Sequence, residues 1–446
     1  MSTTDKSITI IGAGLVGSLL SIYLARRGYA VTMYERRPDM RKENISAGKS
    51  INLALSDRGW RGLQGVGIED AIRKVAIPMS GRMMHSVKGE LTYQQYGEEG
   101  QFIFATSRGI LNCVMMDEAE KKGVKIVFNH RCTRIDMENS TAYFDGPSGP
   151  AEVKSRLIFS ADGAFSAGRM ALQLGTDRFD YSQSYLKHAY KELLIPAGKD
   201  GSFLMEKNAL HIWPRGGFML IALPNLDGSF TCTLFYPYEG ENSFAKIKTE
   251  DDCNQFFKTN FPDALALMPD LSKQFFHNPT SSLVTVKCFP WTYKDKLCLI
   301  GDAAHAIVPF YGQGMNCGFE DCTVLESLLE KYNEDWAKVL PAYQQARKPN
   351  SDAIADLAIM NFVEMRDLVG TPEFLLRKKI EAHMHEKYPE KWLPLYSQVT
   401  FSAIPYSEAL ANGLRQDQIM RKVMSVPGIE SKWNSEEVEK MILAQL

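Results

Sequence analysis

The 446-residue sequence predicts an α/β fold in which a nucleotide-binding domain alternates along the chain with a sheet-built domain and is followed by a helical region. A strand, a glycine-rich turn, a helix and a second strand fit residues 7–35, which is the order of a mononucleotide-binding unit. Residues 181–286 alternate apolar with polar side chains between frequent Gly, Pro and Asn residues, a pattern typical of an antiparallel sheet. From Ser351 almost to the C-terminus the apolar spacing is helical.

The mononucleotide-binding unit begins with a predicted strand at Ser7–Ile11 and the turn GAGLVG, which supplies Gly12, Gly14 and Gly17. In such units the glycines make the tight turn, admit a pyrophosphate and let the helix pack closely. The second strand ends at Glu35, whose carboxylate would accept hydrogen bonds from ribose hydroxyls and repel a 2′-phosphate. The unit therefore predicts a site for FAD or NAD.

A second glycine-rich segment, GDAAHAIVPFYGQGMN, runs from Gly301 to Asn316, far from the first along the chain. It follows a predicted buried strand at Leu297–Ile300 and precedes a helical pattern that opens at Cys317. An acidic residue after a strand, followed by a glycine-rich turn into a helix, suits a polar or anionic ligand. Small residues also let a flat ligand approach the backbone. We expect the two segments to bind the two ends of one large ligand.

Composition and charge exclude several classes of function. The net charge is −2 and no basic block occurs, so nucleic acid is not an expected partner. The eight cysteines are scattered without a Cys-x-x-Cys pair, which indicates free thiols in a reducing compartment. No signal peptide and no stretch of ~20 apolar residues is apparent, so we predict a cytoplasmic protein without a membrane span. The oligomeric state is left open.

Metal or triad chemistry is not predicted. His383 and His385 fall on one predicted helix, where side chains two residues apart point in different directions. The histidines therefore do not indicate a metal site, and no Ser–His–Asp set stands out. His305, within the second glycine-rich segment, is interpreted as a structural residue rather than a general base.

A third motif, DGAFSAGR, runs from Asp162 to Arg169 between the two glycine-rich segments. The order and spacing of the three motifs resemble those of the single-component FAD-dependent aromatic hydroxylases. The resemblance covers nearly the whole chain. Further matching stretches, several of them specific to members that hydroxylate an amino acid with an aniline ring, are SINLALSDRG (50–59), GRMMH (81–85), SRGILN (107–112), SFTCTLFYP (229–237) and NFVEMRD (361–367). The resemblance implies bound FAD, transient NADPH, O₂ as co-substrate and ring hydroxylation through a flavin C4a-hydroperoxide. No catalytic side chain is expected, because the flavin supplies the chemistry.

The pattern of elements along the chain predicts three parts, which the resemblance identifies as a Rossmann-type FAD-binding domain, an antiparallel-sheet substrate domain and a C-terminal helical cap. Their expected ranges are 1–75 with 101–180 and 287–350 for the first, 76–100 with 181–286 for the second, and 351–446 for the third.

The expected FAD-binding residues come from all the matching motifs. They are Gly12, Gly14, Gly17, Glu35, Arg36, Leu53, Ala54, Arg108, Asp162, Gly301, Asp302, Gly312, Gly314, Met315 and Asn316. Asp302 is expected to bond ribityl hydroxyls. The backbone amides of Gly314–Asn316, at a helix start, would face the N1/O2 edge of the ring, where the helix dipole stabilises reduced, anionic flavin.

The expected substrate site combines a polar end with an apolar chamber. Arg82 can pair bidentately with a carboxylate, and the resemblance adds Tyr96, Asn361 and Tyr396 around the carboxylate and amine, with Glu364 as an orienting residue. An apolar wall must exclude water during the reaction. Its candidates, each of which also fits an ordinary core position, are Leu210, Met219, Ile221, Leu223, Phe235, Pro309, Phe310 and Met365. The role of Tyr311 is left open.

Two alternatives stay open. A hydroxylase of the same family that acts on a hydroxybenzoate or salicylate type of ring would share the FAD motifs but would give no reason for the set of Arg82 and its partners. A non-hydroxylating FAD protein would share them as well. A flavin halogenase is not favoured, because the sequence has no W-x-W-x-I-P motif.

Overall fold

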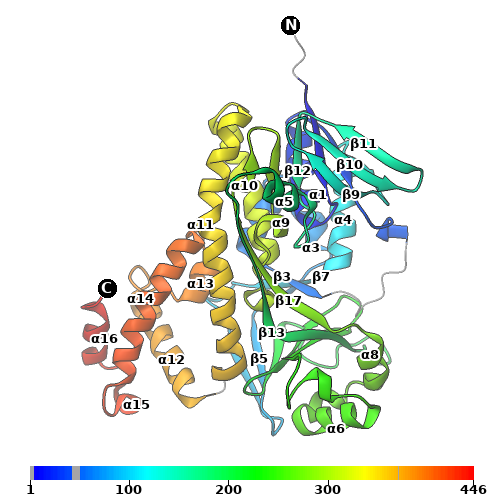
Figure 1. The fold of residues 1–446 in the computed structure, drawn as a ribbon. Helices are drawn as coiled ribbons and strands as arrows, with labels where there is room; N and C mark the ends of the chain where they lie inside the picture. The colour runs from blue at the N-terminus through cyan, green and yellow to red at the C-terminus, as the bar shows by residue number, and fades with distance from the viewer. Residues whose placement is uncertain (1–4, 43–50, 370) are drawn as a thin grey trace.

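The computed structural model describes residues 5–42, 51–369 and 371–446, and these residues form four sheets flanked by helices (Figure 1). The six-stranded sheet is parallel except for β18, which pairs antiparallel with β19. In sheet order its strands are β18 (Thr292–Tyr293), β19 (Leu297–Leu299), β12 (Leu157–Ser160), β1 (Ser7–Ile11), β2 (Ala30–Tyr34) and β8 (Lys125–Val127). The predicted strand–turn–helix–strand unit is thereby confirmed.

Helices accompany the six-stranded sheet of this domain. They are α1 (Leu15–Arg26), α4 (Arg108–Lys121), α5 (Ala167–Gly175), α9 (Asp302–His305) and α10 (Gly314–Lys331). Of these, α9 and α10 begin within the second glycine-rich segment. Helix α10 begins three residues before the predicted start at Cys317, so Met315 and Asn316 lie in its first turn. A small antiparallel sheet packs beside the domain and consists of β9 (Arg131–Asp136), β10 (Thr141–Gly146) and β11 (Gly149–Lys154).

The seven-stranded sheet confirms the predicted antiparallel domain, with one parallel pair, β14 with β5. Its order is β17 (Ser281–Phe289), β13 (Asp180–Ile195), β16 (Phe230–Pro237), β15 (Met219–Pro224), β14 (Ala209–Pro214), β5 (Gly81–His85) and β6 (Leu91–Gln95). As the alternation predicts, Met219 and Ile221 pack on one face and Leu220 and Ala222 on the other. Helices α6 (Glu250–Asn260), α7 (Pro262–Leu265) and α8 (Leu271–His277) cover the second face.

A three-stranded sheet contacts both large domains. It comprises β3 (Asn52–Leu55), β7 (Ile103–Ser107) and β4 (Ile77–Met79), with α2 (Asp57–Gln64) and α3 (Glu69–Arg73). Strand β7 packs against β15, and β3 packs against α10. Helix α2 packs against α10. The strand β3 is thus placed next to the second glycine-rich segment.

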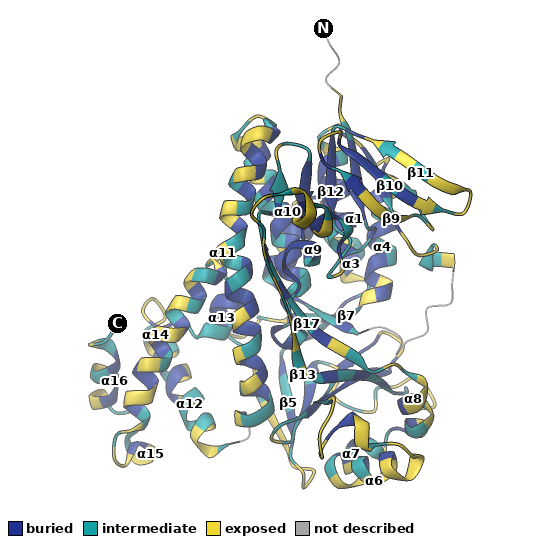
Figure 2. Cartoon of the chain, viewed as in Figure 1, coloured by how far each residue is buried: buried dark blue, intermediate teal, exposed yellow. Residues whose placement is uncertain are grey.

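The C-terminal region is helical, as predicted. Figure 1 shows α11 (Trp336–Val363) between the sheets and the last helices, and the chain continues through a π-turn at Glu364–Leu368. The last helices are α12 (Pro372–Lys387), α13 (Leu395–Thr400), α14 (Tyr406–Met424), α15 (Ile429–Lys432) and α16 (Glu436–Leu443). Helix α11 crosses the proposed boundary between residues 350 and 351, and its inner side is buried (Figure 2).

None of the helices in the described ranges has the length and apolar character needed to cross a membrane.

The core beneath α6 and α8 generates a stability prediction. Phe257 on α6 is fully buried among aromatic side chains, whereas Phe276 on α8 is 46% exposed. Phe257→Ala should lower the free energy of unfolding by about 3–5 kcal/mol, because it removes buried apolar surface and leaves a cavity. Phe276→Ala is the matched control and should change it by less than ~0.5 kcal/mol. Urea denaturation measures both, and equal losses would contradict the assigned core.

Candidate active site

The glycine turn between β1 and α1 has the shape that a pyrophosphate requires. A Cβ on Gly12 (φ +99°) would lie 2.6 Å from the carbonyl oxygen of Ala161, and one on Gly17 would lie 2.1 Å from the carbonyl oxygen of Gly12. Both positions are therefore closed to any side chain. A Cβ on Gly14, the N-cap of α1, would have no atom within 4 Å. The helix N-terminus is open on this side, where its free amides can bind phosphate oxygens.

Glu35 stands beside this turn at the end of β2. Its buried carboxylate accepts hydrogen bonds from the backbone of Ala13 (3.1 Å) and from the backbone (3.0 Å) and Nε (2.8 Å) of Arg37. Although burial opposes ionisation, the Arg37 bonds and charge hold the pKa of Glu35 below its ordinary value. Glu35, which is predicted to bind a ribose, is thus an anion next to the turn. The following residue, Arg36, is exposed.

The DGAFSAGR motif connects the first domain to the second glycine-rich segment. Asp162 accepts hydrogen bonds from Ser160 Oγ and from the backbone of Ala167, both at 2.6 Å, and so it stabilises its own turn. Arg169 is buried and donates from Nη1 to the carbonyl oxygen of Ala303 at 2.9 Å. The motif therefore positions the segment that begins at Gly301.

Asp302 is the first residue of α9 and is half-buried. Its carboxylate accepts no hydrogen bond from any residue that the structure describes, so it is available to hydroxyl donors of a ligand such as the ribityl chain. Gly301 before it has φ +61°, and a Cβ there would lie 3.0 Å from Val16 Cγ2. The backbone approaches α1 closely at this point because the residue is glycine.

The side chain of Asn316 fixes β3 against the second segment. Its Nδ2 donates to the carbonyl oxygens of Ala54 (2.8 Å) and Gly312 (2.7 Å), and its Oδ1 accepts from the backbone of Ser56 (3.0 Å). Gly312 (φ +65°) lets this approach occur, since a Cβ there would lie 3.1 Å from Ala54 Cβ. The predicted residues Leu53, Ala54, Gly312, Gly314, Met315 and Asn316 are thereby gathered at the N-terminus of α10.

Taken together, the residues present fit FAD. Phosphates fit the open turn at Gly14, hydroxyl groups fit the carboxylates of Glu35 and Asp302, and the free amides at the start of α10 fit the polar edge of a ring system. Arg108 is exposed at the start of α4.

Behind the second segment lies a cluster that we term the buried ion network: Arg58, His305, Glu320, Asp321 and Arg347. Asp321 accepts from His305 Nε2 (2.7 Å) and from Arg347 Nε (2.6 Å), and Glu320 accepts from Arg347 Nη1 (2.6 Å) and Arg58 Nη1 (2.5 Å). Burial opposes the charge of His305, but Asp321 raises its pKa well above the ordinary value. These bonds support a structural role for His305.

Three potential metal ligands, His305, Cys317 and Asp321, lie within 4.8 Å of one another in the described part of the chain. Arg347 occupies the place of a cation, because it binds both Asp321 and the sulfur of Cys317 (3.2 Å). His383 and His385 bond to separate partners, Glu439 and the carbonyl oxygen of Trp392, both at 2.8 Å.

Arg82, Tyr96 and Tyr396 meet, as the sequence predicts, although they come from β5, the end of β6 and α13. The Arg82 guanidinium carbon lies 4.8 Å from the ring centre of Tyr396 and 5.4 Å from that of Tyr96, and the two rings stack at 5.2 Å. Burial disfavours the charge of Arg82, but Tyr396, Tyr96 and Glu364 raise its pKa above the ordinary value. The group is a cation.

Within the described residues, Arg82 Nε and Tyr96 Oη are buried and have no hydrogen-bond partner. An unpaired buried donor is costly, about 1–3 kcal/mol each. Two such donors side by side fit a carboxylate ligand, which would accept from both.

Asn361, predicted beside the carboxylate and amine of the substrate, uses its Nδ2 for contacts within the protein. Its Nδ2 donates to the carbonyl oxygen of Phe310 at 2.7 Å and contacts Met365 Sδ at 3.3 Å. Asn361 therefore fixes the turn Pro309–Tyr311 from α11, and the Phe310 ring stacks on Phe362 at 3.9 Å.

The predicted apolar residues pack together in two adjoining clusters, apart from Pro309, which begins the adjacent turn. Met219, Phe235, Phe310 and Met365 belong to one cluster, and Leu223 belongs to a second cluster with Tyr96. Leu210 and Ile221 pack against both clusters.

Comparison with known proteins agrees with this site. The sequence model of a family described as FAD binding domain matches residues 5–358. The kynurenine 3-monooxygenase of Flavobacterium johnsoniae is 52% identical over 446 residues, covering 99% of each chain. That of Christiangramia forsetii is 53% identical over 444 residues (99% of this chain, 98% of the relative), and that of Dictyostelium discoideum is 46% identical over 456 residues (99% and 97%). The chain belongs to the kynurenine 3-monooxygenase family. It therefore has the FAD-binding domain of that family.

Solved structures agree on the fold of this family. The tetrameric form of 2-methyl-3-hydroxypyridine-5-carboxylic acid oxygenase superposes with a TM-score of 0.68 at 21% identity, covering 83% of this chain and 95% of the other. Tetracycline destructase Tet(55) superposes with a TM-score of 0.65 at 17% identity, covering 90% and 98%.

Sequence reasoning missed several residues that shape the site in this family member. Tyr311 stacks on Tyr396 at 5.7 Å with an interplanar angle of 13°, so it extends the Tyr96–Tyr396 stack to the turn beside the FAD site. Arg347 and Arg58 connect α10 to the C-terminal helices. Tyr311 and Arg58 lie within matched stretches whose spacing does not report these contacts, and Arg347 lies outside all of the matched stretches.

The glycine turn generates a prediction that separates binding from folding. Gly14→Ala should fold with a melting temperature within a few degrees of wild type, because its Cβ meets no protein atom, yet should bind FAD at least tenfold more weakly. Gly17→Ala is the matched comparison and should lose the folded domain, because its Cβ would collide with Gly12. FAD titration and thermal unfolding of the apoprotein check both. Unchanged FAD affinity in Gly14→Ala would contradict the site.

Proposed function

We propose that the protein hydroxylates L-kynurenine to 3-hydroxykynurenine, using bound FAD, NADPH and O₂. The observation that carries this is the pair of buried donors Arg82 Nε and Tyr96 Oη, which no described residue pairs and which lie beside a cluster of apolar side chains. Such a pair suits an amino-acid carboxylate, and the relatives at 46–53% identity are named for kynurenine. A hydroxylase for simple benzoates gives no reason for the stacked tyrosines around Arg82.

Different residues bind the amino-acid end and the aromatic end of the substrate. Arg82 binds the carboxylate of the amino acid, and the rings of Tyr96 and Tyr396 hold the guanidinium in place. This leaves the aromatic ring of the substrate toward Phe235, Phe310 and the N-terminus of α10. Bound FAD supplies the redox chemistry that activates O₂.

The remaining contributions are electrostatic and steric. The first-turn amides of α10 stabilise negative charge on the neighbouring ligand. The apolar wall excludes water, which would divert the activated oxygen. The amino group on the aniline ring of the substrate activates the adjacent carbon, so no protein base is required.

All eight cysteines are free thiols, which supports placing the protein in a reducing compartment, the cytoplasm.

The direct test of function measures NADPH consumption by the FAD-loaded protein with and without L-kynurenine, together with chromatographic identification of the product. We expect oxidation that depends on L-kynurenine and formation of 3-hydroxykynurenine. NADPH consumption without this product would reject the assigned substrate while leaving an FAD protein.

Arg82→Ala should raise the KM for L-kynurenine at least tenfold, because it leaves the substrate carboxylate without its charged partner. Arg82→Lys should recover part of the loss, since it restores the charge but not the bidentate geometry. Steady-state rates over a range of L-kynurenine concentrations give both values. Arg421→Ala, exposed on α14, is the control. A wild-type KM in Arg82→Ala would remove this residue from the site.

A further inference from the structure

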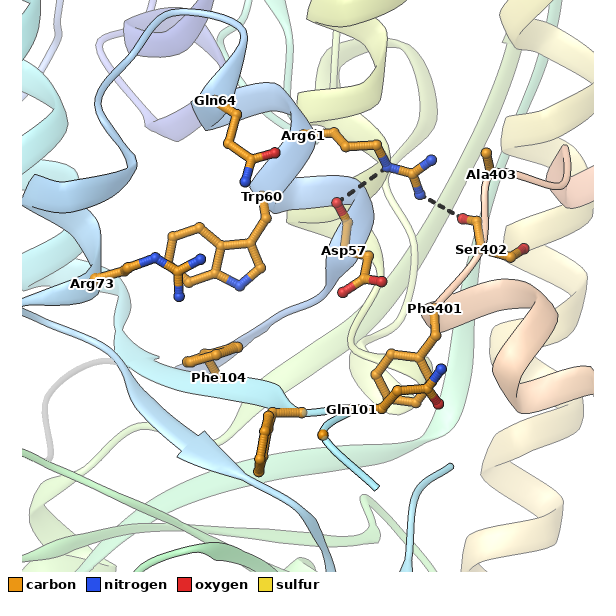
Figure 3. A pocket seen from close by; sticks show the side chains of 12 residues that line it. Asp57, Trp60, Arg61, Gln64, Arg73, Gln101, Phe104, Phe401, Ser402 and Ala403 are labelled. Carbon is orange, nitrogen blue, oxygen red and sulfur yellow. Dashed lines mark hydrogen bonds between the residues drawn. The ribbon is translucent and has the colours of Figure 1, made fainter. Parts of the chain in front are cut away.

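An open pocket of about 570 Å³ lies outside the site described above, between α2, the start of β7 and the turn after α13 (Figure 3). Its volume falls within the ~300–1,000 Å³ that small-molecule sites occupy. The residues on which the following argument depends are Asp57, Trp60, Arg61, Arg73, Phe104 and Phe401. None of them belongs to the predicted FAD or substrate residues.

We propose that this pocket is an outer binding site for the zwitterionic aromatic amino acid that the enzyme hydroxylates, and that Phe401 separates it from the reaction chamber. The inference rests on the proposed function and adds a second, earlier binding site to it.

Two charged side chains of the pocket, Arg73 and Asp57, form no side-chain hydrogen bond or ion pair within the described ranges. Arg73 packs its guanidinium over the ring of Trp60 at 4.5 Å and has no acceptor among the residues that the structure describes. The carboxylate of Asp57 likewise has no donor there. A substrate with a carboxylate and an ammonium group complements both charges.

The wall between these charges is aromatic. Trp60 is 5% exposed and packs edge-on against Phe104 at 5.1 Å. Its Nε1 is buried and unpartnered within the described residues, and in Figure 3 it lies on the edge of the indole that is turned toward the pocket. An aromatic ligand gains apolar contact with these rings, and a carbonyl group on it can accept a hydrogen bond from the indole N–H.

Arg61 closes the outer side of the pocket. It donates to the backbone carbonyl oxygens of Asp57 (3.3 Å) and Ser402 (2.5 Å), so it connects α2 to the turn after α13. The pocket is therefore a built space between two elements rather than a gap between loops.

Phe401 is shared by the pocket and the proposed substrate site. It lines the pocket, and it also packs in the cluster that contains Tyr96 and Leu223. Its ring meets Tyr396 edge-on at 6.1 Å, and Tyr396 contacts Arg82. Gly97 leaves room for it, because a Cβ there would lie 3.3 Å from Phe401 Cδ2. Rotation of this ring would open the pocket toward the carboxylate-binding group.

The test follows L-kynurenine binding to the FAD-loaded protein by stopped-flow flavin absorbance, without NADPH or O₂. The wild-type rate should saturate with L-kynurenine concentration, because fast binding in the pocket precedes slower passage by Phe401. Phe401→Trp should slow the saturated rate at least tenfold in both directions while the equilibrium Kd changes less than twofold. If the variant binds L-kynurenine more slowly and its Kd rises by the same factor, Phe401 only shapes the substrate site. That result would overturn the inference.

Arg73→Gln tests the pocket without touching Phe401. It should lower the second-order association rate at least fivefold and raise the KM for L-kynurenine with less effect on kcat. Lys74→Gln, the adjacent exposed residue that does not line the pocket, should match wild type. Wild-type association in both Arg73→Gln and Phe401→Trp would overturn the inference. A raised KM for NADPH alone in Arg73→Gln would assign the pocket to the dinucleotide instead.

The proposed function and the outer binding site can be rejected by different results. If wild-type protein forms no 3-hydroxykynurenine, the proposed function fails and the outer site fails with it. If wild-type protein forms the product and both variants bind at wild-type rates, only the outer site fails.

Discussion

The placement of the active site depends on the buried ion network of Arg58, His305, Glu320, Asp321 and Arg347. Charges removed from water are tolerated only when each is paired and hydrogen-bonded. Asp321 is fully buried and accepts from the backbone of Gly301 (3.1 Å) in addition to its two charged partners. The network therefore fixes the start of the second glycine-rich segment to the side chains of α10 and α11.

The same network extends to the C-terminal helices. Arg347 lies on α11 and bonds Glu320 on α10, and Arg58 on α2 bonds Glu320 and the carbonyl oxygen of Val399 on α13 at 2.8 Å. Helix α13 also carries Tyr396, which stacks on Tyr96 and Tyr311. The segment that we propose binds FAD and the group that we propose binds the carboxylate are thus held in one arrangement by bonds between elements remote in sequence. A substrate site that spans domains requires such a constraint, because an error of one ångström would misplace the ring.

The sequence predicts most of the fold and the composition of the site, because those features are local. Turn geometry explains Gly12 and Gly17, and strand alternation explains the two faces of β15. The meeting of Arg82 with Tyr96 and Tyr396 is not local, and only the resemblance to the family predicts it. The partners of Asn361, the stack of Tyr311 and the pairing of Arg347 with Asp321 depend on contacts between distant segments. No periodicity or spacing reports such contacts. The proposed domain boundary at 350/351 shows the same limit, since one long helix serves two regions.

Arg347→Met removes the central cation of the network while keeping an unbranched apolar chain in place of the arginine stem. Hydrogen–deuterium exchange of the FAD-loaded variant tests the network most directly. Breaking a buried pair costs about 3–5 kcal/mol, so the folded variant should be less stable. We expect faster exchange both at 301–316 and at 395–404, although residue 347 lies on neither segment. Faster exchange confined to α11 itself, with both distant segments at wild-type rates, would contradict the account.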